Sequence, residues 1–115
     1  MSLNLVELAK KVAAAAEEKK AQRVTIMDIR GLSVVADYFV ICQGNSETQV
    51  QAIATAIKKY AQEENILFKG IEGYDQARWV LIDLGDVVVH VFHKDERDFY
   101  GLERLWGDAQ HVQVQ

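Results

Sequence analysis

The chain has 115 residues, of which 50% are hydrophobic and 26% charged, and its formal net charge at pH 7 is -4. This length fits one domain with a real core, and the composition excludes wholesale disorder. An acidic chain lacks the clustered lysine and arginine that bind a nucleic-acid backbone, so we expect a basic protein partner and no direct nucleic-acid binding.

The sequence carries no segment that addresses it to a membrane. No apolar run approaches the roughly 18 residues of a membrane span, and no signal-peptide pattern opens the chain. We therefore expect a cytoplasmic protein. Cys42 is the only cysteine, which excludes an intrachain disulfide, and its apolar neighbours predict a small buried hydrophobe rather than a catalytic thiolate.

Two helices are predicted in the first two-thirds of the chain. Asn4 is a candidate N-cap with Glu7 three residues on, and apolar residues then recur at three- and four-residue spacing up to Ala16. Ser46 with Gln49 forms a second capping box before the apolar stripe of residues 50–57. We expect Asn65 to close that helix in a left-handed conformation.

Five strands and a third helix complete the prediction. The strands are residues 23–29, 37–43 and 66–72, followed by the two strands of a hairpin within residues 78–92. Asp95 is a candidate cap for the last helix, whose apolar face contains Phe99, Leu102 and Leu105 or Trp106, and Gly107 ends it. Residues 1–108 are expected to form one domain, and residues 109–115, which lack a pattern, a mobile tail.

The predicted fold is a two-layer α/β domain with a mixed five-stranded sheet and the order α-β-β-α-β-β-β-α. Three helices are too few to cover both faces of such a sheet, so we expect them mainly on one face. The other face is predicted to stay at least partly open. Function should be sought there.

Alternation divides the hairpin into two faces. The aliphatic sets are expected to be core, whereas the sets with Trp, Asp and His suit a partner surface. A two-residue turn at Leu84-Gly85 would pair Asp83 with Asp86 and unite the aliphatic sets, whereas a three-residue loop with Gly85 left-handed would change which faces coincide. We favour the uniting register. The expected core is Val80, Ile82, Val87, Val89 and Val91, and the expected surface set of the first strand is Trp79, Leu81 and Asp83.

Two constellations could indicate chemistry. The turn Gly44-Asn45-Ser46 could cradle a phosphate at a helix N-terminus, which makes a nucleotide-binding enzyme or nucleotidyltransferase the alternative function. No Asp-x-Asp or Asp-x-Glu is present to bind the metals that such a transferase needs, so helix capping is favoured. His90 and His93 stand three apart on a strand and point to opposite faces, which argues against a metal site with Asp83, Asp86 or Asp95. We expect no metal, no cofactor and no catalysis.

Several ordered motifs together resemble the Iojap-related ribosomal silencing factors. The resemblance extends from about Leu5 to Asp108. The motifs are DIRGLS (28–33), ADYFVI (36–41), GNS (44–46), EG (72–73), RWVLIDLGDVVVHVF (78–92) and FYGLERLW (99–106).

This resemblance implies a nucleotidyltransferase-like fold without transferase activity and a homodimer. It further implies binding to protein uL14 of the large ribosomal subunit, which blocks joining of the small subunit and represses translation when nutrients are scarce. The implied uL14-facing residues are Trp79 and Tyr100, with Leu81 by strand parity and Asp98 and Glu103 as acids near Tyr100. A dimeric adaptor for another basic protein is a further possibility.

Overall fold

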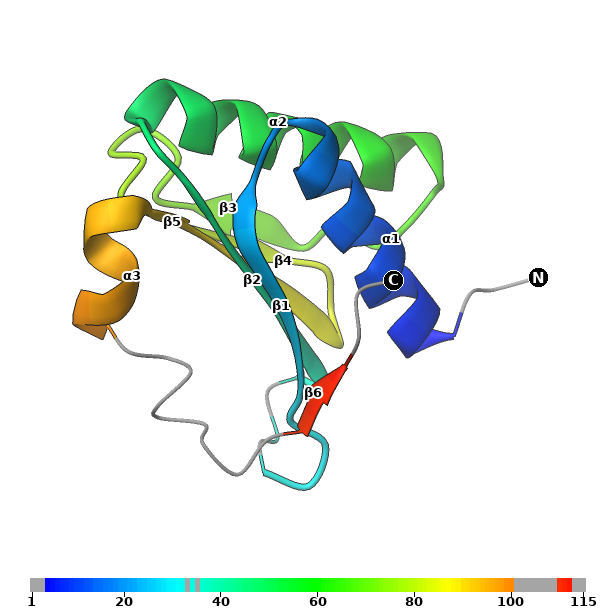
Figure 1. Cartoon of the computed structure of the whole chain (residues 1–115). Helices are drawn as coiled ribbons and strands as arrows, with labels where there is room; N and C mark the ends of the chain where they lie inside the picture. The colour runs from blue at the N-terminus through cyan, green and yellow to red at the C-terminus, as the bar shows by residue number, and fades with distance from the viewer. Residues whose placement is uncertain (1–3, 33, 35, 101–109, 113–115) are drawn as a thin grey trace.

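The computed structural model describes residues 4–32, 34, 36–100 and 110–112, with backbone alone for residues 98–100 and 110–112. Its elements run along the chain in an order that alternates helices with groups of strands (Figure 1). They are α1 (Leu5–Glu18), β1 (Gln22–Asp28), β2 (Tyr38–Gly44), α2 (Glu47–Glu63), β3 (Gly70–Glu72), β4 (Trp79–Asp83), β5 (Val87–His93), α3 (Lys94–Tyr100) and β6 (Gln110–Val112).

All five predicted strands lie in one mixed sheet, whose order is β3-β4-β5-β2-β1-β6. The central pair, β2 with β5, is parallel, and the other neighbours are antiparallel. The α/β class and the mixed sheet are therefore confirmed. The strand predicted over residues 66–72 is shorter than expected, because only its last three residues pair with β4.

A strand that the sequence analysis did not predict lies within residues 109–115. Gln110–Val112 forms a sixth strand, β6, antiparallel to β1 with His111 opposite Met27. A three-residue strand carries too little periodicity to be recognised from sequence. Its partner is the otherwise free edge of β1, which only the assembled sheet presents.

Local capping chemistry begins α1 and α2 as predicted, whereas α3 begins at Lys94, one residue before the predicted cap Asp95, whose backbone amide donates to His93 Nδ1 at 3.2 Å. Asn4 accepts a hydrogen bond from the backbone N–H of Glu7 at 2.8 Å, and Ser46 accepts one from that of Gln49 at 3.1 Å. Each bond satisfies an amide that the first turn of a helix leaves unpaired. Asn65 takes a φ of +55° just past α2, as expected for a left-handed closing residue.

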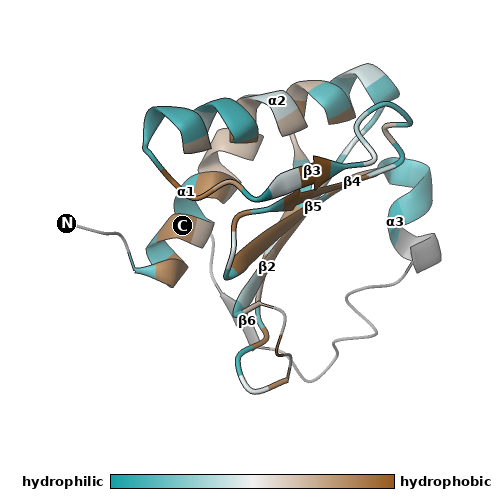
Figure 2. Cartoon of the chain, turned by 180° about the vertical axis from the view of Figure 1, so that it is seen from behind, coloured by the Kyte–Doolittle hydropathy of each residue, from teal (hydrophilic) through white to brown (hydrophobic). Residues whose placement is uncertain are grey.

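Helices α1 and α2 cover one face of the sheet (Figure 1). Their apolar stripes pack on inward-facing strand residues in the larger core cluster, and Figure 2 shows β4 and β5 as strongly apolar ribbons beneath α2. The aliphatic hairpin residues predicted as core all belong to this cluster and are fully buried. They are Val80, Ile82, Val87, Val89 and Val91.

The opposite face is partly covered by apolar side chains and partly open. A second core cluster lies there, and Met27, Ile41 and Phe92 within it have no exposed surface. The β4 residues of this face, Trp79, Leu81 and Asp83, stay half-buried. The number of helices does not predict this cover, because segments outside the helices also contribute apolar side chains, such as Ile29 and Ala36.

The hairpin turn lies one residue later than predicted. Asp83 pairs with Val88, and the Leu84 amide donates to the Val87 carbonyl at 3.0 Å, so the turn residues are Gly85 and Asp86. Gly85 takes a positive φ of +90°. A two-residue turn at Leu84-Gly85 would have required a positive φ at Leu84, so the observed turn avoids strain at a branched residue. The aliphatic sets still share one face, as expected, because the pairing shifts by an even number of residues.

Gly73 lies directly against the backbone of β4. Its φ is +80°, and a Cβ placed on it would lie 2.2 Å from the Trp79 carbonyl oxygen. We predict that Gly73→Ala lowers the free energy of unfolding by at least about 2 kcal/mol, through left-handed strain and displacement of β4. Gly70→Ala is the matched control, since nothing lies within 4 Å of its Cβ position. Urea denaturation of both variants tests this, and equal midpoints would contradict it.

Candidate interaction surface

The face of β4 opposite the helices carries the residues that the sequence singled out. Burial alternates along the strand: Val80 and Ile82 are buried, whereas Trp79, Leu81 and Asp83 are half-buried. The alternation follows from the strand period of two, because one set faces α2 and the other faces away. Trp79 and Leu81 thus lie two residues apart on one face. We call Trp79 and Leu81 the β4 surface.

The Trp79 indole is held by aromatic neighbours on β5. Phe92, its partner in the strand pairing, stacks with it at 5.2 Å between ring centroids and an angle of 27°. The indole Nε1–H donates a hydrogen bond to His90 Nδ1 at 3.1 Å. Phe39 of β2 meets the His90 ring edge-on at 4.6 Å. A stack and a directional bond therefore fix the indole together.

His90 is a buried titratable group in this cluster. Its side chain is 4% exposed, and burial lowers its pKa from 6.5 to about 4. The ring is therefore neutral at pH 7, and since Nδ1 accepts the indole proton, the imidazole proton lies on Nε2. Nε2 is enclosed and has no hydrogen-bond partner among the described residues.

Helix α3 begins beside the start of β4. The His93 amide donates to the Arg78 carbonyl at 2.9 Å, which joins the last residue of β5 to the residue before Trp79. The Arg78 side chain also lies 3.3 Å from the Glu96 carboxylate in the first turn of α3. The backbone of α3 is therefore fixed next to the β4 surface.

A buried arginine of α3 forms hydrogen bonds with β1. Arg97 is 2% exposed and donates to the Arg23 carbonyl and, at 3.3 Å, to Thr25 Oγ1. The register of β1 shifts between Gln22 and Thr25, and Arg23 there takes a φ of +51°. The Arg23 carbonyl at this irregularity accepts the hydrogen bond from α3. A buried guanidinium requires such acceptors.

The comparisons with known proteins match nearly the whole chain. The family model described as "Ribosomal silencing factor during starvation" matches residues 2–115. A ribosomal silencing factor RsfS of Halalkalibacterium halodurans is 62% identical over 88% of this chain and 86% of its own length. That of Bacillus subtilis is 59% identical over 93% and 91%, respectively.

The chain belongs to the ribosomal silencing factor family. The recognised Iojap relationship is also confirmed, since the chloroplastic protein Iojap of Zea mays is 31% identical over 90% of this chain and 45% of its own length. A solved structure from Bacillus halodurans superposes with a TM-score of 0.84 at 56% identity, covering 94% of this chain and 98% of that one. A structure from Chromobacterium violaceum gives 0.89 at 33% identity, covering 91% and 88%.

For this silencing-factor chain, the structure places some of the predicted site residues and not others. Trp79 and Leu81 lie together as the parity argument predicted. Asp98 and Tyr100 lie on α3, but their side chains are outside the description, and Glu103 is outside the described residues altogether. Their role in a binding surface stays a prediction.

Two residues that the sequence reading did not assign to the site are His90 and Arg97. His90 was considered as a metal ligand and as a member of the mixed hairpin face, but it was not among the residues predicted to contact the partner. Arg97 left no signal, because its acceptor on Arg23 lies 74 residues away. Within the described ranges, no group of three His, Cys, Asp or Glu side chains is placed to hold a metal ion.

The turn Gly44-Asn45-Ser46 is occupied by the capping box of α2. The Asn45 amide donates to Gln49 Oε1 at 2.7 Å, and Ser46 Oγ accepts from the Gln49 amide. The Gln49 side-chain amide also donates to the carbonyls of Lys19 and Lys20 at the end of α1, at 3.2 and 3.0 Å. The backbone amides of Asn45 and Gln49, which a phosphate at this helix N-terminus would need as donors, therefore already bond within the chain. This disfavours the hypothesis that the turn binds a nucleotide.

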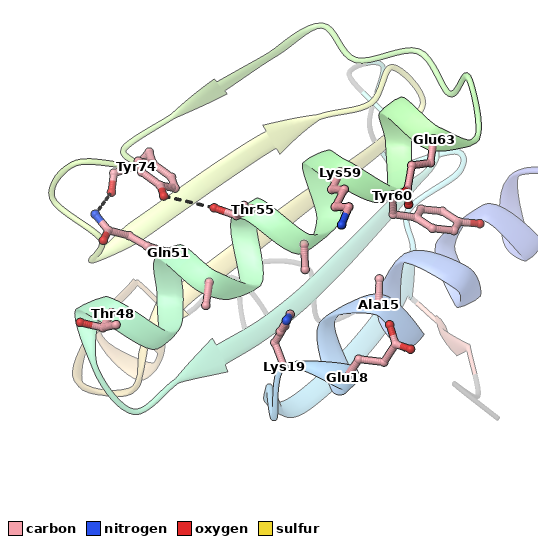
Figure 3. Close-up of a pocket in the computed structure, with 12 residues that line it drawn as sticks. Ala15, Glu18, Lys19, Thr48, Gln51, Thr55, Lys59, Tyr60, Glu63 and Tyr74 are labelled. Carbon is pink, nitrogen blue, oxygen red and sulfur yellow. Dashed lines mark hydrogen bonds between the residues drawn. The ribbon is translucent and has the colours of Figure 1, made fainter.

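A groove of about 690 Å³ follows the outer face of α2, with the end of α1 on one side and Tyr74 on the other, away from the β4 surface (Figure 3). Alanines form part of its lining, and the charged residues that border it are Glu18 of α1, Lys19 just after α1, and Lys59 and Glu63 of α2. The Tyr74 carbonyl accepts a hydrogen bond from the Gln51 side-chain amide, and the Tyr74 hydroxyl bonds to Thr55 Oγ1. The groove lies in the helix layer, and neither Trp79 nor Leu81 lines it.

No helix among the described residues has the length and apolarity to cross a membrane.

Burial of neutral His90 predicts a dependence of stability on pH. The folded pKa of about 4 lies below the ordinary value of 6.5, so the unfolded chain binds more protons between these values. This contribution to the free energy of unfolding is complete above pH 6.5 and is lost as pH falls toward 4, by up to about 3 kcal/mol.

The measurement is urea unfolding between pH 7 and pH 4.5 for the wild type and for His90→Phe. The variant keeps His93 and every carboxyl group but lacks this titration, so its stability should fall less over the same interval. Parallel pH profiles for the two proteins would contradict the assignment.

Proposed function

We propose that this chain binds the large ribosomal subunit through protein uL14 and prevents the small subunit from joining. Translation is thereby repressed when nutrients are limited. The protein acts by occupying a surface and catalyses no reaction, and its place of action is the cytoplasm. The observation that carries the proposal is the β4 surface in a chain of the ribosomal silencing factor family.

The chemistry of the β4 surface suits a protein partner. Trp79 and Leu81 offer half-buried apolar area on a rigid strand. Tryptophan in particular provides a large contact area at small entropic cost, and it is frequent among the residues that dominate binding energy. Because Val80 and Ile82 lock the same strand into the core, the surface is presented with little freedom to rearrange.

Helix α3 supplies the second half of the proposed contact. Asp98 and Tyr100 lie on it, and Glu103 follows in the sequence. The Arg78–Glu96 ion pair and the buried Arg97 keep the helix backbone beside Trp79. Acidic side chains here suit a basic ribosomal protein, and the net charge of -4 would steer the encounter.

We also propose that the protein forms a homodimer, as the family resemblance implies. Light scattering coupled to size exclusion would measure the mass against the 13.0 kDa of one chain. The expected result is twice that mass. A mass of one chain at micromolar concentration would contradict this part of the proposal.

We predict that Trp79→Ala and Tyr100→Ala each weaken binding to purified large subunits by at least about tenfold, since each removes an aromatic anchor. Gradient sedimentation measures binding, and light scattering of mixed subunits measures joining. Wild-type protein in excess should block joining, whereas the variants should not.

Leu67→Ala is the matched control for these variants. Leu67 is a large apolar residue that is 63% exposed and lies outside the proposed surface. It should bind and block like the wild type. Normal subunit joining with excess wild type would contradict the proposed function. Unchanged binding by folded Trp79→Ala and Tyr100→Ala would contradict the assignment of these residues to the binding surface. A pull-down that recovers another basic protein without uL14 would favour an adaptor instead.

A further inference from the structure

The Trp79 ring is fixed in two different ways, and each removes a different freedom. Stacking on Phe92 holds the indole plane at 27° to a neighbouring ring but still permits sliding and rotation within the indole plane. The hydrogen bond from Nε1 to His90 Nδ1 removes that rotation, because a hydrogen bond is directional. His90 therefore selects which edge of the indole faces outward.

His90 is itself held firmly enough to act as a fixed acceptor. It lies on β5, a strand that is buried along its length, and it pairs with Leu81 on one side and Ile41 on the other. Phe39 contacts its ring edge-on, and Phe92 stacks at 6.3 Å. An acceptor that cannot move gives its donor a single position.

Packing alone does not account for a histidine at this position. With its proton on Nε2, the ring carries a buried N–H donor that has no partner among the described residues. An enclosed, unpaired donor is unfavourable, and a phenylalanine would fill similar space without one. The feature that phenylalanine cannot supply is the Nδ1 lone pair that accepts the indole proton.

We propose that His90 is a positioning residue of the docking surface, which orients the Trp79 indole for contact with the ribosomal partner. This inference rests on the proposed function. His90 is too buried to provide much contact area of its own, so it acts through Trp79. The expected consequence of losing the acceptor is a surface of the same composition whose anchor samples several orientations and binds less tightly.

A double-mutant cycle separates positioning from general stability. His90→Phe should weaken binding to large subunits about fivefold at pH 7, the scale of one hydrogen bond. In a Trp79→Phe background, which lacks the donor, the same change should have almost no further effect. An equal loss in both backgrounds, or wild-type binding by His90→Phe, would overturn the proposal. Cooperative urea unfolding of each variant confirms that it is folded.

His90→Asn provides the conservative comparison, since its amide oxygen can accept near the position of Nδ1. It should bind closer to the wild type than His90→Phe does, although it fills less of the core. The reverse order would contradict a role for the acceptor and would indicate that ring packing alone matters.

A readout without the ribosome keeps the two proposals apart. The Trp79 indole N–H resonance can be identified by its loss in Trp79→Phe. It should exchange slowly with solvent in the wild type, and it should shift and exchange faster in His90→Phe. An unchanged resonance would refute positioning even if the protein binds subunits. A changed resonance in a protein that binds no subunits would leave positioning intact and refute the proposed function.

Discussion

The rest of the structure depends on the parallel pairing of β2 with β5. Both strands are buried along all seven residues, and they pair from Tyr38 with Val87 to Gly44 with His93. A strand pair with no exposed face must be covered on both sides. Helices α1 and α2 cover one side. On the other, Met27 and Phe39 join a second apolar cluster, which covers that face in part.

The functional surface is placed where that coverage ends. Strand β4 is one step from the centre, so its inner residues are still needed by the core, whereas Trp79 and Leu81 reach the margin of the second cluster. A residue at such a margin is rigid on one side and accessible on the other. This combination allows an aromatic side chain to be ordered before a partner arrives, which lowers the entropic cost of binding.

Polar groups set the geometry around this apolar framework. Gln49 connects the start of α2 to the end of α1, and Arg97 connects α3 to the irregular start of β1. Each is a side chain whose donors reach backbone carbonyls that the regular elements leave available. Hydrogen bonds of this kind contribute modestly to net stability, and the part-buried bonds of Arg97 are costly to break, so they specify one arrangement.

The sequence by itself determined the features that depend on neighbours a few residues apart. Asn4 and Ser46 cap their helices because the bond closes within three residues, and the division of β4 follows from its period of two. Only the tertiary structure decided the features that join distant segments. These include the pairing of β6 with β1, the 11-residue reach from Trp79 to His90 and the 74-residue reach from Arg97 to Arg23. The physical reason is that such bonds have no local signature, since their partners become neighbours only after the sheet has formed.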